Sequence, residues 1–304
     1  MKFAVFQDSR VGGRPYNQDR QGICCKREST LLVIADGMGG IKHGEVAAQI
    51  VVDHLLKHFK ALARPKIDHP NRFLVNAVTT AHHSIMEYAA VHQLEEVPST
   101  TVVAAIIQDN MLYWCHVGDS RLYLFDQEGV VLRSRDHSQV QRMIDQGFIN
   151  SSAIKEHPDR SKIYNCLGAL RDPEVEVGPK TQLEEGMTLL LCTDGLWGYF
   201  EDEELEKAFA LRDVSVALPI LMNIAEKRGE GRGDNLSAVS ITLVGDAKFK
   251  TNSPFFVDTD TIPDDTNPEQ RVIQQRAEEE IVMELDNDLD QKAFEEIQRG
   301  QKFY

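Results

Sequence analysis

The 304-residue sequence predicts an α+β fold in which antiparallel sheets are covered by helices. From residue 100 onward, several strand-like runs are separated by turns too short to join parallel strands, and this spacing predicts antiparallel pairing. Two stretches, 44–91 and 202–228, carry apolar residues at helical spacing. Sheets with a helical pair on either side in the sequence favour a layered arrangement.

The N-terminal part of the chain predicts two strands followed by two helices. Residues 2–8 (KFAVFQD) and 30–35 (TLLVIA) have the alternating or continuous apolar, β-branched character of strands. Residues 44–62 and 72–91 place apolar side chains three or four positions apart, as on one face of a helix.

The middle of the chain predicts a meander of consecutive hairpins within one antiparallel sheet. Residues 137–185 then form a less regular, polar segment with a short helix at 139–146, and long insertions of this kind are typical of functional loops or flaps. The remaining predicted strands are 100–108, 111–119, 121–126, 130–134, 187–194 and 235–244.

Composition and charge narrow the functional classes. The first ten residues already contain charged and polar side chains and no later segment is apolar over transmembrane length, so we expect a cytoplasmic protein. A net charge of −15 argues against nucleic acid or an anionic membrane as a partner. The five cysteines form no CxxC pair, and we expect neither a disulfide nor a zinc site.

The sequence predicts a domain boundary near residue 246. Residues 251–304 carry 14 acidic and 5 basic side chains, and residues 251–270 have the composition of a linker. Apolar positions within 269–299 predict a partly helical segment. We therefore expect a domain over 1–246 and an acidic tail over 247–304, which is either solvated or binds a partner or the chain's own domain.

Aspartates recur where predicted strands begin or end. Asp36, Asp119 and Asp194 each close an apolar run beside a glycine, Asp234 precedes the last strand, and Asp19 follows the first. One such residue alone indicates a turn. Several at a shared sheet edge would repel one another unless a cation neutralises them. Oxygen ligands favour Mg²⁺ or Mn²⁺ over Zn²⁺.

A pair of such ions suits hydrolytic phosphoryl chemistry, because the ions can acidify water, orient a phosphate and stabilise the entering and leaving oxygens. The aspartate pattern does not identify the substrate. A nuclease and a structural metal site remain open on the residues alone.

The motifs, taken together, resemble the metal-dependent protein phosphatase family, also called PPM or type 2C, in its bacterial form. The resemblance implies a four-layer α-β-β-α sandwich with two antiparallel sheets and a metal centre in the cleft between them. The matching segments, in the order of the family, are RPYNQD (14–19), DGMGG (36–40) with GE (44–45), GDSRLY (118–123), RDHS (135–138), CTDG (192–195) and GDNLS (233–237).

The resemblance implies the following metal ligands for Mn²⁺ or Mg²⁺. Asp36 would bridge two ions and Gly37 would offer its backbone carbonyl to one of them. Asp194 and Asp234 would bind the other ion, and Asp119 matches a ligand of a third, weaker position in bacterial members.

The resemblance also implies a protein serine/threonine phosphatase that acts on phosphorylated proteins and opposes a serine/threonine kinase. Arg14 would grip the substrate phosphate, Asp19 would orient metal-bound water, and no phosphoenzyme would form. Three alternatives remain: a regulatory pseudophosphatase or phosphoprotein-binding module, a phosphatase acting on an anti-sigma-factor antagonist, and a phosphatase for small phosphomonoesters.

Four positions depart from common members of the family. Gln18 replaces a glutamate, so one contact to metal-bound water would come from a neutral amide. Met38 and Ile41 stand where some members have histidine, and Asn165 stands where arginine is common.

Overall fold

The computed structural model describes most of the chain and divides it into two units, Met1–Asp260 and Thr261–Tyr304. All of the second unit lies outside the described residues, including the whole of the helix predicted within 269–299. The residues described are 2–38, 43–150, 157–211, 213–245 and 256–259.

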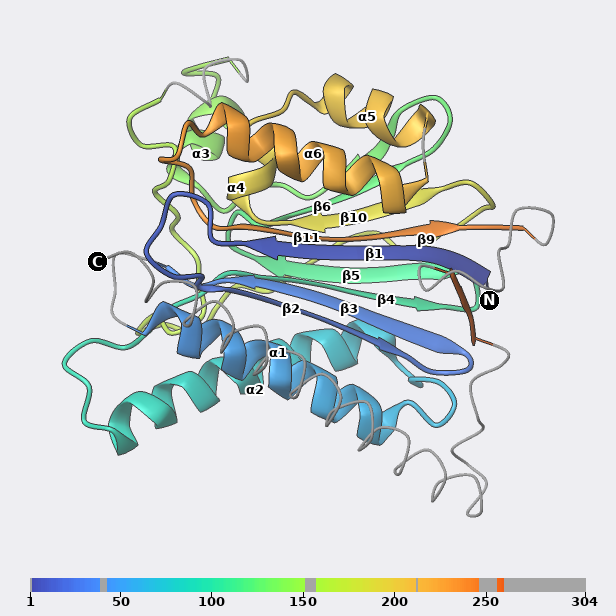
Figure 1. Ribbon diagram of the computed structural model, residues 1–304. Coiled ribbons are helices and arrows are strands. Elements are labelled where there is room, and N and C mark those ends of the chain that lie inside the picture. The colour runs from blue at the N-terminus through green and yellow to red at the C-terminus, as the bar shows by residue number, and fades with distance from the viewer. Residues whose placement is uncertain (1, 39–42, 151–156, 212, 246–255, 260–304) are drawn as a thin grey trace, which may run out of the picture. The chain divides into compact units, whose positions relative to one another are not determined.

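Two antiparallel sheets pack face to face, and helices cover both outer faces (Figure 1). Helices α1 and α2 pack on one sheet, and α4, α5 and α6 on the other. This arrangement confirms the predicted α+β four-layer sandwich. The strand orders are β12-β1-β11-β10-β6-β7 in the first sheet and β2-β3-β4-β5-β8 in the second, with β9 also pairing with β5.

The bounds of the elements agree closely with most predicted segments. The helices are α1 (Gly44–Leu62), α2 (Pro70–Val91), α3 (Gln139–Asp145), α4 (Asp194–Trp197), α5 (Asp202–Leu211) and α6 (Val214–Arg228). The strands are β1 (Lys2–Arg10), β2 (Asp19–Cys25), β3 (Ser29–Asp36), β4 (Val102–Gln108), β5 (Met111–Val117), β6 (Arg121–Phe125), β7 (Val130–Arg133), β8 (Glu176–Val177), β9 (Thr181–Gln182), β10 (Thr188–Cys192), β11 (Leu236–Leu243) and β12 (Phe256–Asp258).

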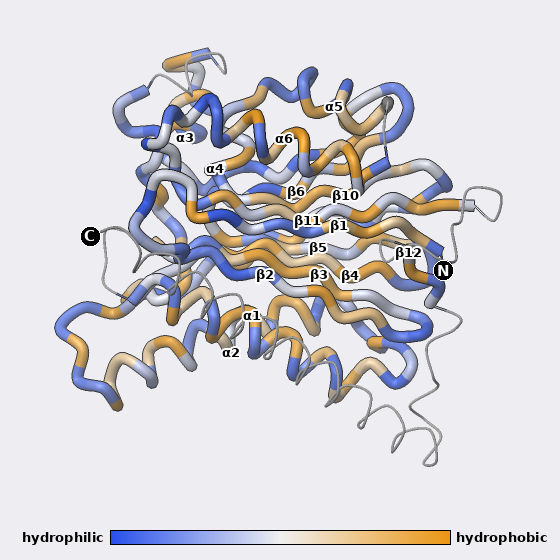
Figure 2. Tube along the Cα trace, in the orientation of Figure 1, coloured by the Kyte–Doolittle hydropathy of each residue, from blue (hydrophilic) through white to orange (hydrophobic). Residues whose placement is uncertain are grey.

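Burial on both faces explains the continuous apolar runs of the central strands. In β3, Leu31 and Val33 pack with the residues of α1 and α2, whereas Leu32 and Ile34 pack in the layer between the sheets. Alternate side chains of a strand point to opposite faces, so a strand covered on both sides needs apolar residues at every position. Figure 2 shows hydrophobic residues running through both sheets.

The prediction missed strand β2, which lies at the edge of the second sheet beside β3. Its sequence, DRQGICC, has a polar beginning and a glycine at its centre, both unfavourable signals for a strand. A Cβ atom on Gly22 would lie 2.7 Å from Cδ1 of Leu56 on α1. The absence of a side chain at this position thus leaves room for Leu56 where the helix packs on the strand.

The predicted meander is wrong at one connection. β4 pairs with β5 and β6 pairs with β7, but β5 and β6 belong to different sheets. Gly118, with a φ of 105°, lies where the chain leaves one sheet for the other, and a Cβ atom there would lie 2.6 Å from Cγ2 of Thr101. The short turn after β5 therefore connects the two sheets, because β6, the strand that follows it, pairs with β10 of the first sheet.

Two further regions bear on the sequence analysis. The predicted flap contains α3 and the two short strands β8 and β9, which pair with β5. The composition of 251–270 predicts a linker, but β12 within it pairs with β1.

The five cysteines are free. Within the described part of the chain, no helix is both long and apolar enough to cross a bilayer.

Candidate metal and phosphate site

The five predicted aspartates meet at one end of the sandwich, and both sheets contribute. Asp19 begins β2 and lies opposite Asp36, the last residue of β3. Asp119 follows β5, Asp194 begins α4 just after β10, and Asp234 precedes β11. The other four carboxylates all repel that of Asp36. The structure therefore brings together residues that lie more than 200 positions apart in the sequence.

Burial dominates the electrostatics of this cluster. It raises the pKa of Asp19 to about 7 and that of Asp194 to about 6, with neighbouring aspartates adding to both shifts. Burial followed by like-charge repulsion also raises the pKa values of Asp36 and Asp119 well above their ordinary value. Several carboxylates that repel one another in a buried position form a site that a cation would stabilise.

Two oxygen atoms in the cluster show how a cation would fit. Oδ1 of Asp19 and Oδ1 of Asp194 are buried and have no hydrogen-bond partner within the described part of the chain. Oδ2 of Asp19 instead accepts a hydrogen bond of 3.0 Å from the hydroxyl of Thr193. Unsatisfied carboxylate oxygens match the ligand preference of Mg²⁺ and Mn²⁺.

Gly37 lies where the backbone passes very close to neighbouring chain. A Cβ atom on this residue would lie 2.4 Å from the carbonyl oxygen of Gly44 at the start of α1. Its N–H donates to the carbonyl of Gln18 at 3.3 Å. A side chain at this position would collide with backbone atoms, so a residue without one is needed beside Asp36.

The departure at Gln18 has a local explanation. Its side-chain Nε2 donates to Oε2 of Glu45 at 3.2 Å, and its backbone N–H donates to Oδ1 of Asn235 at 2.9 Å. A glutamate at position 18 would place a second carboxylate against Glu45. The amide therefore removes a like-charge contact. Of the other departures, Met38 donates its N–H to Ser99, and Ile41 lies outside the described residues.

Arg14 is half-exposed and contacts one of the predicted ligands. Its Nη2 atom donates to Oδ2 of Asp234 at 2.6 Å. Both residues line a pocket of about 350 Å³ that also includes Asp194. Two further arginines, Arg160 and Arg232, line the same pocket. Neither arginine was predicted, because they come from irregular loops far apart in the chain.

A buried chain of contacts fixes the segment that carries Asp119. Nε1 of Trp197 donates to the carbonyl of Asp119 at 3.0 Å, and the guanidinium of Arg121 lies 3.5 Å from the centroid of the Trp197 ring. Arg121 also forms two hydrogen bonds, of 2.8 and 2.7 Å, to Asp136 of the RDHS motif. Asp136 of this motif thus holds Arg121 against Trp197, which in turn binds the backbone of Asp119.

Two other positioning residues were missed although they lie inside the matched motifs. Asn235 accepts from the backbone of Gln18 and donates to the carbonyls of Val11 and Tyr16, so it ties the Arg14 loop to β11. Thr193 holds Asp19 as described above. Asn235 and Thr193 lie beside the predicted ligands Asp234 and Asp194 in the sequence, and this position could have identified them.

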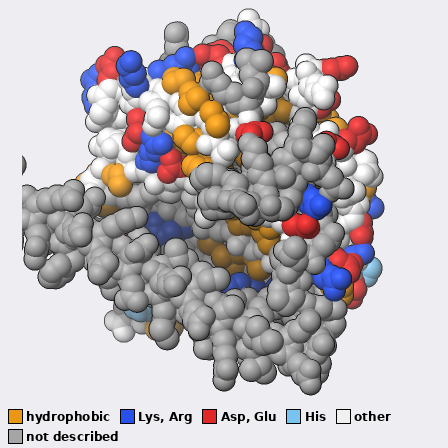
Figure 3. All heavy atoms as spheres, turned by 45° about the vertical axis from the view of Figure 1, so that its right-hand side comes forward, with side chains coloured by type: hydrophobic (Ala, Val, Ile, Leu, Met, Phe, Trp, Pro, Cys, Tyr) orange, Lys and Arg blue, Asp and Glu red, His pale blue; other side chains and the backbone are white. Residues whose placement is uncertain are grey.

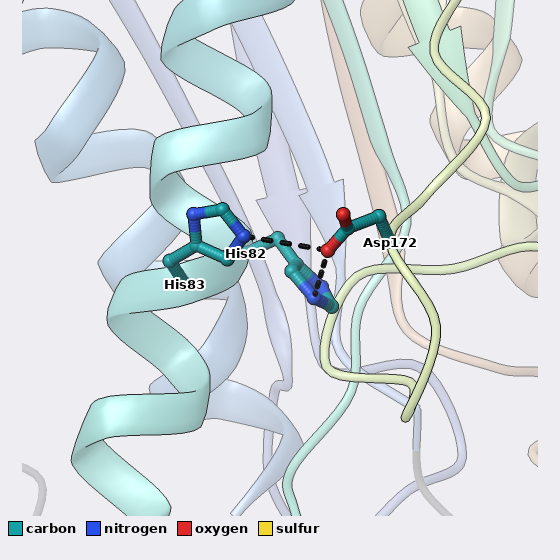
Figure 4. A group of neighbouring side chains, drawn as sticks. All are labelled: His82, His83 and Asp172. Carbon is teal, nitrogen blue, oxygen red and sulfur yellow. Dashed lines mark hydrogen bonds and ion pairs between the residues drawn. The ribbon is translucent and has the colours of Figure 1, made fainter.

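A group outside this cluster, His82, His83 and Asp172, has a spacing that a metal ion could use (Figure 4). However, the N–H of Gly168 donates to Nδ1 of His82 at 3.1 Å. The neutral ring must then carry its hydrogen on Nε2, which faces Asp172 at 3.7 Å. A metal ligand needs a lone pair at that atom, so this group is a hydrogen-bonded support and not a metal site.

The same reasoning applies to His116, His137 and Glu176. Gly118 and Asn165 donate to Nδ1 of His137 at 3.2 and 2.8 Å. Its Nε2 hydrogen therefore points to Glu176, at 3.2 Å. Asn165, the fourth departure, thus has a defined partner in the RDHS motif.

Comparisons with known proteins agree with this geometry. The family model for protein phosphatase 2C matches residues 7–228. A Listeria innocua serine/threonine phosphatase, stp, is 27% identical over 78% of this chain and 94% of its own length. The serine/threonine protein phosphatase PstP of Mycobacterium tuberculosis is 34% identical over 70% of this chain, which spans 40% of that relative.

Solved structures are similar as well. The catalytic domain of PstP in complex with two manganese ions has a TM-score of 0.68 and 27% identity, and the match covers 80% of this chain and 99% of that domain. The family model covers well over half of the sequence, including Asp36, Asp119 and Asp194. The chain therefore belongs to the protein phosphatase 2C family, whose members are metal-dependent phosphoprotein phosphatases.

Proposed function

We propose that this protein removes phosphate from phosphoserine and phosphothreonine side chains at a centre of two Mn²⁺ or Mg²⁺ ions. Asp36, the Gly37 carbonyl, Asp194 and Asp234 would hold the two ions. Asp119 would serve a third ion. The main support is the convergence of five aspartates from both sheets, two of which have buried oxygens without a hydrogen-bond partner among the described residues.

The ions would supply an acidified water as nucleophile and charge stabilisation for the phosphate oxygens. Arg14 would donate hydrogen bonds to the substrate phosphate from the pocket mouth. Asp19, held by Thr193 through Oδ2, keeps Oδ1 available to accept a hydrogen bond from the attacking water. No side chain needs to act as nucleophile.

The substrates in this proposal are phosphorylated proteins, and a serine/threonine kinase would act in opposition. The manganese complex of the PstP catalytic domain supports the choice of cofactor. A cytoplasmic location, and binding of the tail over 247–304 to a partner or to the chain's own domain, stay predictions.

The test is hydrolysis of p-nitrophenyl phosphate and a phosphothreonine peptide by the purified full chain, with Mn²⁺ and with EDTA. We expect turnover only with Mn²⁺ and its loss in Asp36→Asn and Asp194→Asn. Asp172→Asn is the matched control, since this carboxylate lies in the histidine group that we exclude as a metal site. A control variant that also lost activity would contradict the assignment.

If the folded wild-type protein shows no turnover with any divalent ion, the pseudophosphatase alternative is favoured. The mutual repulsion of Asp36 with Asp19, Asp119, Asp194 and Asp234 supports the enzyme over that alternative, because a module without metal ions would gain nothing from such a cluster.

A further inference from the structure

The pocket beside the aspartate cluster gathers arginines from three separate loops. Arg14 precedes β2, Arg160 belongs to the loop before β8, and Arg232 precedes β11. On the face of the molecule shown in Figure 3, positive and negative side chains lie side by side. Among the described residues that line the pocket, by contrast, the acidic ones are Asp194 and Asp234, which belong to the candidate metal site.

The loop that carries Arg232 has a defined position next to that of Arg14. The N–H of Gly13 donates to the carbonyl of Gly233 at 2.9 Å, and a Cβ atom on Gly13 would lie 2.5 Å from the carbonyl oxygen of Gly231. The N–H of Arg232 closes a turn by donating to Gly229 at 2.8 Å. Backbone packing therefore presents Arg14 and Arg232 at one pocket wall.

The side chain of Arg232 is available to a substrate. It is 84% exposed, and its ion pair of 3.2 Å is to Glu230, whose side chain is 73% exposed. Exposed pairs of this kind contribute little to stability and exchange readily for another anion. Arg160 lies at the same pocket and its positive charge acts on Asp194, which places it close to the reaction centre.

We propose that Arg160 and Arg232 select phosphopeptides that carry acidic residues next to the phosphorylated side chain. This inference rests on the proposed function, in which Arg14 and the metal ions bind the phosphate itself. The other two arginines then face the residues that flank the phosphate. A preference for acidic peptides would have to come from these arginines, because the net charge of −15 would by itself repel such peptides.

The test compares two phosphothreonine peptides of equal length, one with aspartates on both sides of the phosphothreonine and one with asparagines. Wild-type protein, Arg160→Gln, Arg232→Gln, the double variant and Arg171→Gln are assayed with Mn²⁺ at low and high salt. Arg171 is the matched control, as an exposed arginine in the same loop region that does not line the pocket.

We expect kcat/KM of the wild-type protein to favour the aspartate peptide by roughly three- to tenfold at low salt. High salt and the double variant should each reduce that ratio to below about twofold, while Arg171→Gln keeps it. An equal kcat/KM for the two peptides in the wild-type protein, or an undiminished ratio in the double variant, overturns the inference and leaves the phosphatase assignment intact. Absence of all turnover, including that of p-nitrophenyl phosphate, overturns both.

Discussion

Asp19 and Asp36 lie directly opposite each other in the β2–β3 pair, so their carboxylates leave the sheet on the same face. Each raises the electrostatic cost of ionising a buried neighbour, and the Asp36 carboxylate also meets repulsion from the opposite sheet. The repulsion lowers the stability of the metal-free protein, and a bound cation would relieve it. Such a loss of stability is common at functional sites.

The first prediction concerns stability without metal. Asp36→Asn should raise the melting temperature of the EDTA-treated protein, because it removes a buried charge from a repulsive cluster, by about 2–4 °C for each kcal/mol relieved. The same variant should lose most of the increase that Mn²⁺ gives the wild-type protein. Circular dichroism melting with EDTA and with Mn²⁺ measures both effects. A lower metal-free melting temperature for the variant would count against the repulsion.

The second prediction concerns Arg14. Arg14→Lys keeps the charge but loses the planar fork, and we expect kcat/KM for a phosphopeptide to fall roughly tenfold, with Arg14→Ala falling roughly 100-fold. Steady-state kinetics with Mn²⁺ measures the loss, and an unchanged melting temperature excludes misfolding. The alanine variant remaining within twofold of the wild-type protein would remove Arg14 from phosphate binding.

The third prediction concerns the pair of Arg121 and Asp136, whose side chains are only 6% and 4% exposed. Arg121→Met should cost about 3–5 kcal/mol in the free energy of unfolding, since it leaves a buried carboxylate without its partner. The double variant with Asp136→Leu should recover part of that loss. Urea unfolding of the four proteins gives the coupling energy, and additive losses would show that the pair does not interact as described.

The fourth prediction concerns pH and lies far from the metal site. Burial, with the nearby His58 and Lys57, lowers the pKa of His54 from 6.5 to about 4. Between these values the unfolded chain binds a proton that the folded chain does not, so stability is lost as pH falls from 6.5 towards 4. His54→Gln should therefore lose less stability on acidification. Urea unfolding at about pH 7.5 and about pH 5 compares the two, and equal losses would contradict the shift.

Local patterns in the sequence were sufficient to predict most helices and strands, and to predict that oxygen ligands would favour Mg²⁺ or Mn²⁺. Helices α1 and α2 follow from apolar spacing, and β3 and β10 follow from continuous apolar runs. The aspartates that end these strands predicted a shared site because strand ends lie at sheet edges. The fold class and the family are confirmed, whereas the role of each ligand stays a prediction for the variants above.

Only the tertiary structure decided the remaining features, because each depends on contacts between distant segments. Strand β2 has a weak sequence pattern, and its central Gly22 is explained by the side chain of Leu56 on α1, which would contact a Cβ atom there. The sheet that β6 joins is set by its pairing with β10 and not by the short turn before it. Arg160 and Arg232 reach one pocket through loop packing, which no periodicity encodes. The sequence by itself determined most of the elements and the candidate ligands, and long-range packing decided which side chains surround them.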